Sequence, residues 1–186
     1  MSHPKEDLIS PAVKFGVDRE ALASMMRIES GSHMEKELNA VAKDAESLAA
    51  PKAAYRIVYI DSRDDFNVMA EGVTFTSRVL RVNTENANRL FPFLSTCGTE
   101  LGEWSESISD ILHKGWAEAI KGQALRAALE TVKNHISHYH HKGKTAKMTP
   151  GSLQDWPIEQ QEPLFELLAA ARDYTGVELL ESLYMK

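Results

Sequence analysis

The chain has 186 residues, of which 43% are hydrophobic and 26% are charged, and this composition excludes a chain that is disordered throughout. Its 21 Lys and Arg residues against 27 Asp and Glu residues give a net charge of −6, which argues against a broad nucleic-acid surface. The single cysteine, Cys97, excludes an internal disulfide and a zinc site built on paired thiolates.

The sequence shows neither the pattern of a membrane helix nor that of a signal peptide. No stretch reaches the ~18 consecutive apolar residues of a membrane helix. Residues 1–10 also lack the basic-then-apolar order of a signal peptide. We therefore expect a cytoplasmic protein without a membrane partner. We expect residues 1–17 to form an N-terminal extension and residues 18–186 to form one α+β domain.

The N-terminal part of the predicted domain has two helical patterns. The first predicted helix begins at Asp18, whose carboxylate can accept hydrogen bonds from the next turn, and runs to Ile28. Gly31 and Ser32 break it. A second helix is predicted over residues 34–49, because apolar side chains recur there every three to four residues.

Strand patterns follow the second helix. Two runs rich in β-branched and aromatic residues, 55–61 and 66–75, are joined by a polar turn and predict an antiparallel hairpin. Helical spacing returns over residues 76–91. A third apolar run, 91–97, ends at Gly98 and is predicted to be a strand.

The C-terminal half is predicted to be mainly helical. Apolar residues keep one helical face over residues 107–136, which predicts a long helix. A polar, basic segment comes next, followed by a predicted helix over 159–173 that Gly176 ends and a strand-like start at Val177. Strands mixed with long helices indicate the α+β class.

Four histidines, His135, His138, His140 and His141, lie close together in the sequence. Neutral imidazoles are the commonest ligands for zinc, copper or nickel. However, if the helix persists to His138, only His135 and His138 share a face, and no HExxH pattern is present. A solvated helix end, where cationic side chains suit the helix dipole, is the favoured interpretation, and a metal site is the alternative.

Two further places could carry chemistry. Cys97 stands between a strand-like run and a glycine, but no signature of a cysteine hydrolase surrounds it, which favours a small buried side chain over a nucleophile.

The turn 150–152 is preceded by three lysines, Lys142, Lys144 and Lys147, and its amides could help these lysines to hold an anion. A solvated surface loop is the favoured interpretation, and an anion site is the alternative. Trp156, held extended by the following proline, is expected to anchor the next helix.

The order of these motifs carries more information than any one of them. Thr96-Cys97-Gly98 follows a strand, a long alanine-rich helix comes next, and then KMTPGSLQDWPIEQQEPLFELL and TGVELLESLYM follow. Together they resemble the activation (reactivation) domain of cobalamin-dependent methionine synthase, in the form of its small stand-alone relatives. The resemblance covers about residues 20–186 and is most specific over 92–98 and 147–185.

The resemblance implies a twisted antiparallel β-sheet flanked by long helices, which binds S-adenosylmethionine in a shallow groove and faces a corrinoid. The family domain supplies the methyl donor when oxidised cob(II)alamin is reduced and remethylated. This chain lacks the Asp-x-His-x-x-Gly pattern of a cobalamin-binding module. Cobalamin is therefore expected only through a partner, either a corrinoid protein or a methionine synthase lacking its own activation domain. The chain is then at most an accessory to a methyltransferase.

The resemblance also suggests which residues bind S-adenosylmethionine and where the chain departs from the family. Lys147 stands where the family has an arginine, and lysine lacks the fork that grips a carboxylate in two places. Arg126 stands where the family has an acid near the cationic end of the ligand. The family's closing strand would follow Lys186. No catalytic or metal-binding residue is predicted, and the predicted cofactor-binding residues are Lys147, Pro150, Gly151, Glu118, Thr96, Cys97 and Gly98.

These departures make weak binding of S-adenosylmethionine the expectation. They also leave two alternatives to the leading hypothesis of a stand-alone activation-domain-like protein. One is a partner-binding module without catalytic function that has lost S-adenosylmethionine. The other is a metal-binding protein built on the histidines.

Overall fold

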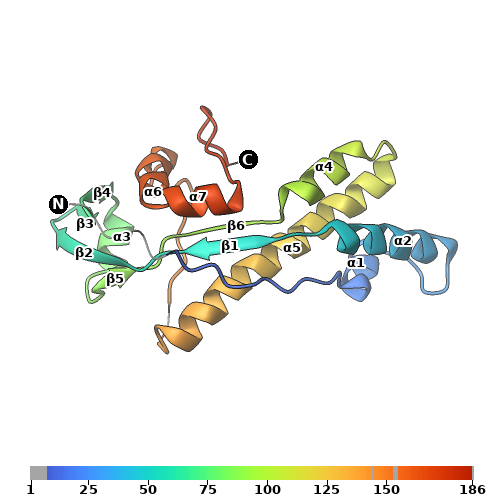
Figure 1. Cartoon of the computed structure of the whole chain (residues 1–186), viewed down its shortest axis with the longest axis horizontal. Helices are drawn as coiled ribbons and strands as arrows, with labels where there is room; N and C mark the ends of the chain where they lie inside the picture. The colour runs from blue at the N-terminus through green and yellow to red at the C-terminus, as the bar shows by residue number, and fades with distance from the viewer. Residues whose placement is uncertain (1–7, 144, 153–154, 186) are drawn as a thin grey trace. The chain divides into compact units, whose positions relative to one another are not determined.

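A computed structural model describes residues 8–143, 145–152 and 155–185, and its helices and antiparallel strands place the chain in the α+β class (Figure 1). The chain divides into two compact units. Unit 1 consists of Met1–Ser10, Ala54–Leu94 and Ile136–Lys186, and unit 2 consists of Pro11–Ala53 and Ser95–His135.

Unit 2 is helical. It contains α1 (Arg19–Met25), α2 (His33–Leu48), α4 (Thr99–Ser107) and most of α5 (Ile111–Tyr139). The helices predicted from Asp18 and over residues 34–49 are confirmed. Asp18 caps α1 by accepting from the Ala21 amide at 2.9 Å, and Ser32 caps α2. The apolar faces of these helices meet in a core made of Val17, Leu22, Leu38, Ala42, Ala45, Leu101, Trp116, Ile120 and Ala124.

The main sheet lies in unit 1. It consists of β2 (Val58–Arg63), β3 (Asn67–Ala70), β4 (Val73–Thr76) and β5 (Arg89–Leu90), paired antiparallel in the order β4-β3-β2-β5. Val68 pairs with Phe75 and Ile60 pairs with Ala70, so that one face of the sheet collects apolar side chains. That face packs in a core with Leu80 of α3 (Arg78–Asn83), Trp156 and Leu167.

The predicted hairpin is present, but each of its two runs is divided. The first run, 55–61, contributes to β1 (Lys52–Tyr55) and β2, which are separated by the buried Arg56. The second run, 66–75, reverses at Glu71 and Gly72 to form β3 and β4. Both turn residues have positive φ, 48° and 80°, as a tight hairpin turn between twisted strands requires. The prediction of one continuous strand over 66–75 is therefore wrong.

The predicted third strand is confirmed as β6 (Phe93–Thr96). It pairs with β1 in a separate two-stranded sheet, and the boundary between the units falls within both strands. The helix predicted over 76–91 is shorter than expected, because α3 ends at Asn83. Thr84 ends it by bonding back to Leu80 with both its amide and its hydroxyl.

The long predicted helix is present as α5, which begins at Ile111 and continues to Tyr139. The residues before it form a separate helix, α4, that was not predicted. The helix predicted over 159–173 is divided at Leu168 into α6 (Gln161–Leu167) and α7 (Ala169–Thr175), after a 3-10 turn over Ile158–Gln160.

Gly176 ends α7 in the left-handed conformation, as predicted, with φ 75°. The strand expected from Val177 does not form. An isolated bridge joins Leu179 to Met185 instead.

The described part of the N-terminal segment is bound to the folded chain. Ile9 exchanges two backbone hydrogen bonds with Tyr55, at 3.0 and 2.9 Å, and Val17 is buried in the core of unit 2. No helix among the described residues is long and apolar enough to cross a bilayer.

Candidate functional site

The Pro-Gly segment of unit 1, whose described residues are 147–152 and 155–161, holds three of the predicted site residues. Lys147 is exposed and Pro150 is buried. Gly151 has φ 81°, and a Cβ atom there would lie 3.1 Å from the Cβ of Ile158. Both the backbone conformation and the close approach require glycine at this position.

The amides of this turn are already used within the turn. The Gly151 amide donates to the Trp156 carbonyl at 2.8 Å, and the Ser152 amide donates to the Thr149 carbonyl at 3.1 Å. The alternative in which these amides are open to an anion is therefore wrong. Any anion binding in this segment depends on the Lys147 side chain.

Side chains from the second half of the segment fix it to the sheet and to α3. Trp156 is buried in the unit 1 core, which confirms its predicted role as an anchor. The Asp155 carboxylate accepts from the Val79 amide at 2.9 Å, and Gln160 Oε1 accepts from the Thr76 amide at 2.7 Å. No local pattern predicts the Asp155 and Gln160 contacts, because their partners Val79 and Thr76 lie far away in the chain.

The other four predicted site residues lie in unit 2. Thr96, Cys97 and Gly98 form the bend between β6 and α4, and the Gly98 amide donates to Thr96 Oγ1 at 3.1 Å. Gly98 has φ 96°, and a Cβ atom there would lie only 2.7 Å from the Ala50 carbonyl oxygen. Glycine is therefore required for the chain to enter α4 at this point.

Glu118 belongs to a polar group that we call the Ser105 cluster, consisting of Ser105, Glu118 and Lys121. Ser105 is fully buried between α4 and α5, and its Oγ lies 3.2 Å from Glu118 Oε1. Lys121 Nζ donates to Ser105 Oγ at 3.1 Å and to Glu118 Oε1 at 3.0 Å. The carboxylate of Glu118 thus has an ion-pair partner on its own helix.

Cys97 is half-buried against the core of unit 2, within electrostatic reach of this cluster. Burial raises the pKa of the Cys97 thiol above its ordinary value, while the nearby charge of Lys121 acts in the opposite direction and that of Glu118 reinforces the rise. The thiol is therefore protonated at neutral pH and a poor nucleophile, in agreement with the favoured sequence interpretation.

The histidines at the end of α5 do not form a metal centre in the described part of the chain. His140 packs edge-on against Tyr55, with ring centroids 5.9 Å apart, and lies 6.0 Å from the ring of Phe91. His138 contacts Tyr139. No group of three or more His, Cys, Asp or Glu side chains among the described residues is arranged to hold a metal ion.

The predicted site residues thus form two groups, Lys147 with the Pro-Gly turn in unit 1 and Cys97 with Glu118 in unit 2. Ser105 and Lys121 were not among the predicted site residues. The three-residue spacing of Glu118 and Lys121 on α5 was a signal for their ion pair.

No protein-family model and no curated protein sequence matches this chain.

Proposed function

We propose that this chain is a stand-alone, activation-domain-like protein of the methionine synthase system, which docks on a corrinoid protein and supports S-adenosylmethionine-dependent reactivation of its cobalamin. The order of motifs along the sequence supports this proposal. The observation that carries it is the Pro-Gly segment, in which a turn that requires Gly151 is anchored by buried Trp156 and follows exposed Lys147.

The residues fit S-adenosylmethionine only in part. Lys147 is exposed and can form a charge-assisted hydrogen bond with a carboxylate, although without the two-point grip of arginine. In unit 2, the residues that the resemblance assigns to a cationic group fit it poorly, because Glu118 is paired with Lys121 and Arg126 adds a positive charge. We therefore expect weak binding and assign no chemical step to these residues.

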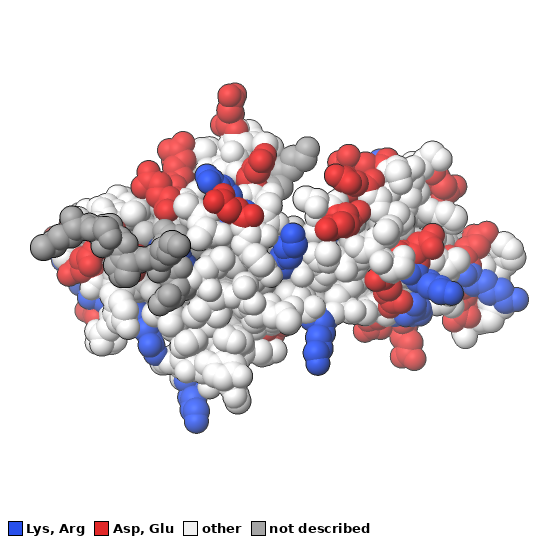
Figure 2. Space-filling view, viewed as in Figure 1, with Lys and Arg blue, Asp and Glu red and all other residues white. Residues whose placement is uncertain are grey.

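The docking face that we propose includes the lysines before the Pro-Gly turn. Lys142 and Lys147 are exposed, whereas Lys144 lies outside the described residues. Acidic side chains gather over α6 and α7 (Figure 2). The lysines therefore offer a contrasting cationic region, which suits an anionic, phosphate-bearing corrinoid.

The alternative function is a partner-binding module that no longer uses S-adenosylmethionine. The ion pair between Glu118 and Lys121, with N and O 3.0 Å apart, favours this alternative, because it occupies the carboxylate that a sulfonium or ammonium group would need.

One reconstitution distinguishes the two functions. A methionine synthase lacking its activation domain, in the cob(II)alamin state, is supplied with a reductant and S-adenosylmethionine, with and without this chain. The absorption spectrum then reports methylcobalamin. We expect methylation to depend on the chain and to be lost when Lys142 and Lys147 are both changed to glutamate. Lys36→Glu, a reversal at an exposed lysine of α2, is the matched control and should behave as the parent.

Complex formation without methylation, at any concentration of S-adenosylmethionine, would support the partner-binding module instead. If the corrinoid protein neither binds the chain nor is methylated in its presence, both functions are excluded.

A further inference from the structure

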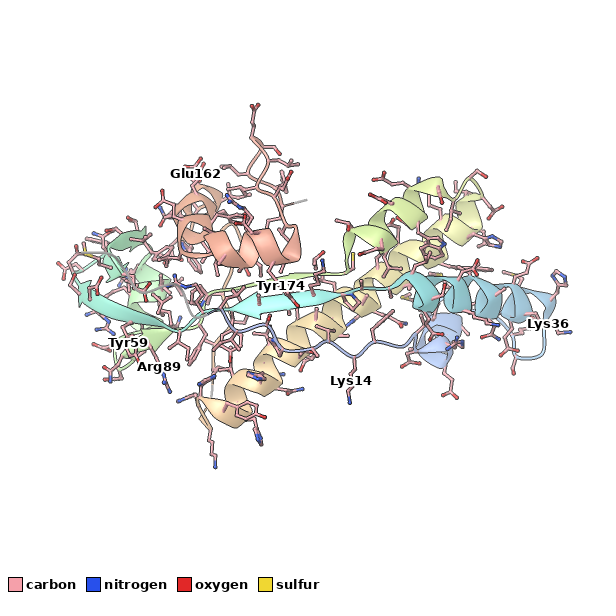
Figure 3. The ribbon with its side chains drawn as sticks, in the orientation of Figure 1. Lys14, Lys36, Tyr59, Arg89, Glu162 and Tyr174 are labelled. Atoms are coloured by element: carbon pink, nitrogen blue, oxygen red, sulfur yellow. The ribbon has the colours of Figure 1, made fainter. Side chains whose placement is uncertain are left out.

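A groove of about 530 Å³ runs along unit 2, and its lining includes Arg126 but none of the predicted cofactor-binding residues. One wall is the extended segment that begins at Lys14 together with α1, and the other wall is one face of α5 that carries Ala119, Gln123, Arg126 and Glu130. Figure 3 labels Lys14 on the segment before α1. A volume of this size falls within the roughly 300–1,000 Å³ of small-molecule sites.

Hydrogen bonds hold the two walls at a fixed separation. The Asp18 amide donates to Gln123 Oε1 at 2.8 Å, and Gln123 Nε2 donates back to the Asp18 carbonyl at 3.1 Å. The Val17 amide donates to Glu46 Oε1 at 2.8 Å, and Val17 itself is buried. The segment is therefore clamped to α5 on one side and to α2 on the other. The groove is already formed before any ligand arrives, which lowers the entropic cost of binding.

The lining of the groove is largely apolar between its charged positions. Phe15 and Met25 stand on one wall, and Ala119 and Ala127 stand on the α5 wall. Met25 leaves 60% of its surface exposed, although it is a large hydrophobic residue. The two alanines, eight positions apart on α5, leave space beside the helix. An apolar body of a few carbon atoms can cover these side chains and remove them from water.

The groove is lined by two cations and two carboxylates, and only the cations lack a hydrogen-bond or ion-pair partner among the described residues. Lys14 and Arg126 are exposed and have no ion-pair partner among the residues that the structure describes. The two acids of the groove are engaged elsewhere, because Asp18 caps α1 and Glu130 pairs with Lys133 at 3.1 Å. A ligand that enters the groove therefore meets two unpaired cations and two carboxylates that already have partners.

We infer that this groove binds a small organic anion, a carboxylate on an apolar or aromatic body. The apolar part lies between Phe15, Met25 and the alanines of α5, and the carboxylate accepts charge-assisted hydrogen bonds from Lys14 and Arg126. The two cations repel a positively charged ligand from the same place. This inference does not depend on the proposed function.

The test uses three probes with the same body and different charge: phenylbutyrate, its neutral amide, and phenylbutylamine. Calorimetric titration of the full chain should show the carboxylate binding at least about tenfold more tightly than the amide, and the amine most weakly. Binding of the amide as tightly as the carboxylate would overturn the inference, because the cations would then have no role.

Variants of the groove residues test whether the probe binds in the groove. Changing Lys14 and Arg126 together to glutamine should weaken phenylbutyrate binding about tenfold or more, whereas Lys36→Gln on α2 should leave it unchanged. Ala127→Phe should block binding by filling the groove without altering its charge. Undiminished binding to the double variant would exclude the groove as the site. The double variant decides the question even if Ala127→Phe fails to fold, because it changes only exposed side chains.

Discussion

The guanidinium of Arg56 and the carboxylate of Glu71 lie 2.8 Å apart and join the start of β2 to the turn between β3 and β4. A second guanidinium nitrogen of Arg56 donates to the carbonyl of Leu167, the last residue of α6, also at 2.8 Å. Only 10% of the Arg56 side chain is exposed. One buried cation thus connects the sheet of unit 1 with the helices that cover it.

Removing this cation should destabilise unit 1. We expect Arg56→Met to lower the free energy of unfolding by about 2–3 kcal/mol, because a partly buried carboxylate and a carbonyl lose a charged donor. Glu71→Gln keeps an acceptor oxygen and should cost only about 1 kcal/mol. Urea unfolding of both single variants and of the double variant measures the coupling between the two residues. A coupling of zero would show that the pair makes no net contribution.

Two glycines near the start of α4 give a matched pair of substitutions. Gly98→Ala should destabilise the chain by more than about 1 kcal/mol, because φ is 96° and the new Cβ would lie 2.7 Å from the Ala50 carbonyl oxygen. Gly102→Ala, inside α4, meets no atom within 4 Å and should stabilise the helix by about 0.5–1 kcal/mol. Thermal unfolding measures both. Equal effects of the two substitutions would contradict the backbone requirement at Gly98.

The reactivity of Cys97 should depend on its charged neighbours. Because burial raises the pKa of the thiol and Lys121 opposes this rise, Lys121→Met should raise the pKa further and slow alkylation at neutral pH. Glu118→Gln removes a negative charge, so it should lower the pKa and speed alkylation. Rates of reaction with iodoacetamide across a pH series measure both changes. If both variants alkylate at the parent's rate, the Ser105 cluster does not influence the thiol.

Tyr55 should titrate well above an ordinary tyrosine. Burial raises its pKa from 10.0 to about 12, because the phenolate loses its hydration. Because the folded-state pKa is higher than the unfolded-state pKa, the folded state keeps the full stability associated with protonated Tyr55 below about pH 10. This stability is lost as the pH rises toward about 12. Ultraviolet absorbance of phenolate should show this late step in the parent and not in Tyr55→Phe. A parent in which every tyrosine ionises near its ordinary pKa would contradict the prediction.

Local signals were sufficient to predict α1, α2 and α5. Asp18 marks the start of α1 through its own side chain, and the apolar spacing along α2 and α5 indicates one buried face on each helix. The helix α4 was missed because its N-cap is a glycine without a capping side chain, and because it contains Gly102 and buries only Leu101 and Ser105. The turn at Glu71 and Gly72 was missed because no residue around it interrupts the strand-like run except the glycine itself.

The candidate site was predictable only where its geometry is local. The turn at residues 150–152 and the anchoring role of Trp156 follow from a short stretch of sequence, and both are confirmed. The pairing of Ser105 with Lys121 depends on the packing of α4 against α5, which local periodicity does not specify. Lys14 was not singled out for the same reason, since its wall of the groove is defined by contacts to a helix a hundred residues later.

The path of the chain has a consequence for its synthesis on the ribosome. Because unit 2 is made of residues 11–53 and 95–135, every segment of unit 2 has been synthesised once residue 135 has been added. Unit 1 must wait for α6 and α7, since Phe165, Leu168 and Ala171 pack with Ala54 and Leu94, which are made much earlier. The nascent chain therefore carries the strands of unit 1 with an apolar face uncovered while unit 2 can already fold. No single cleavage of the polypeptide releases either unit as one continuous fragment.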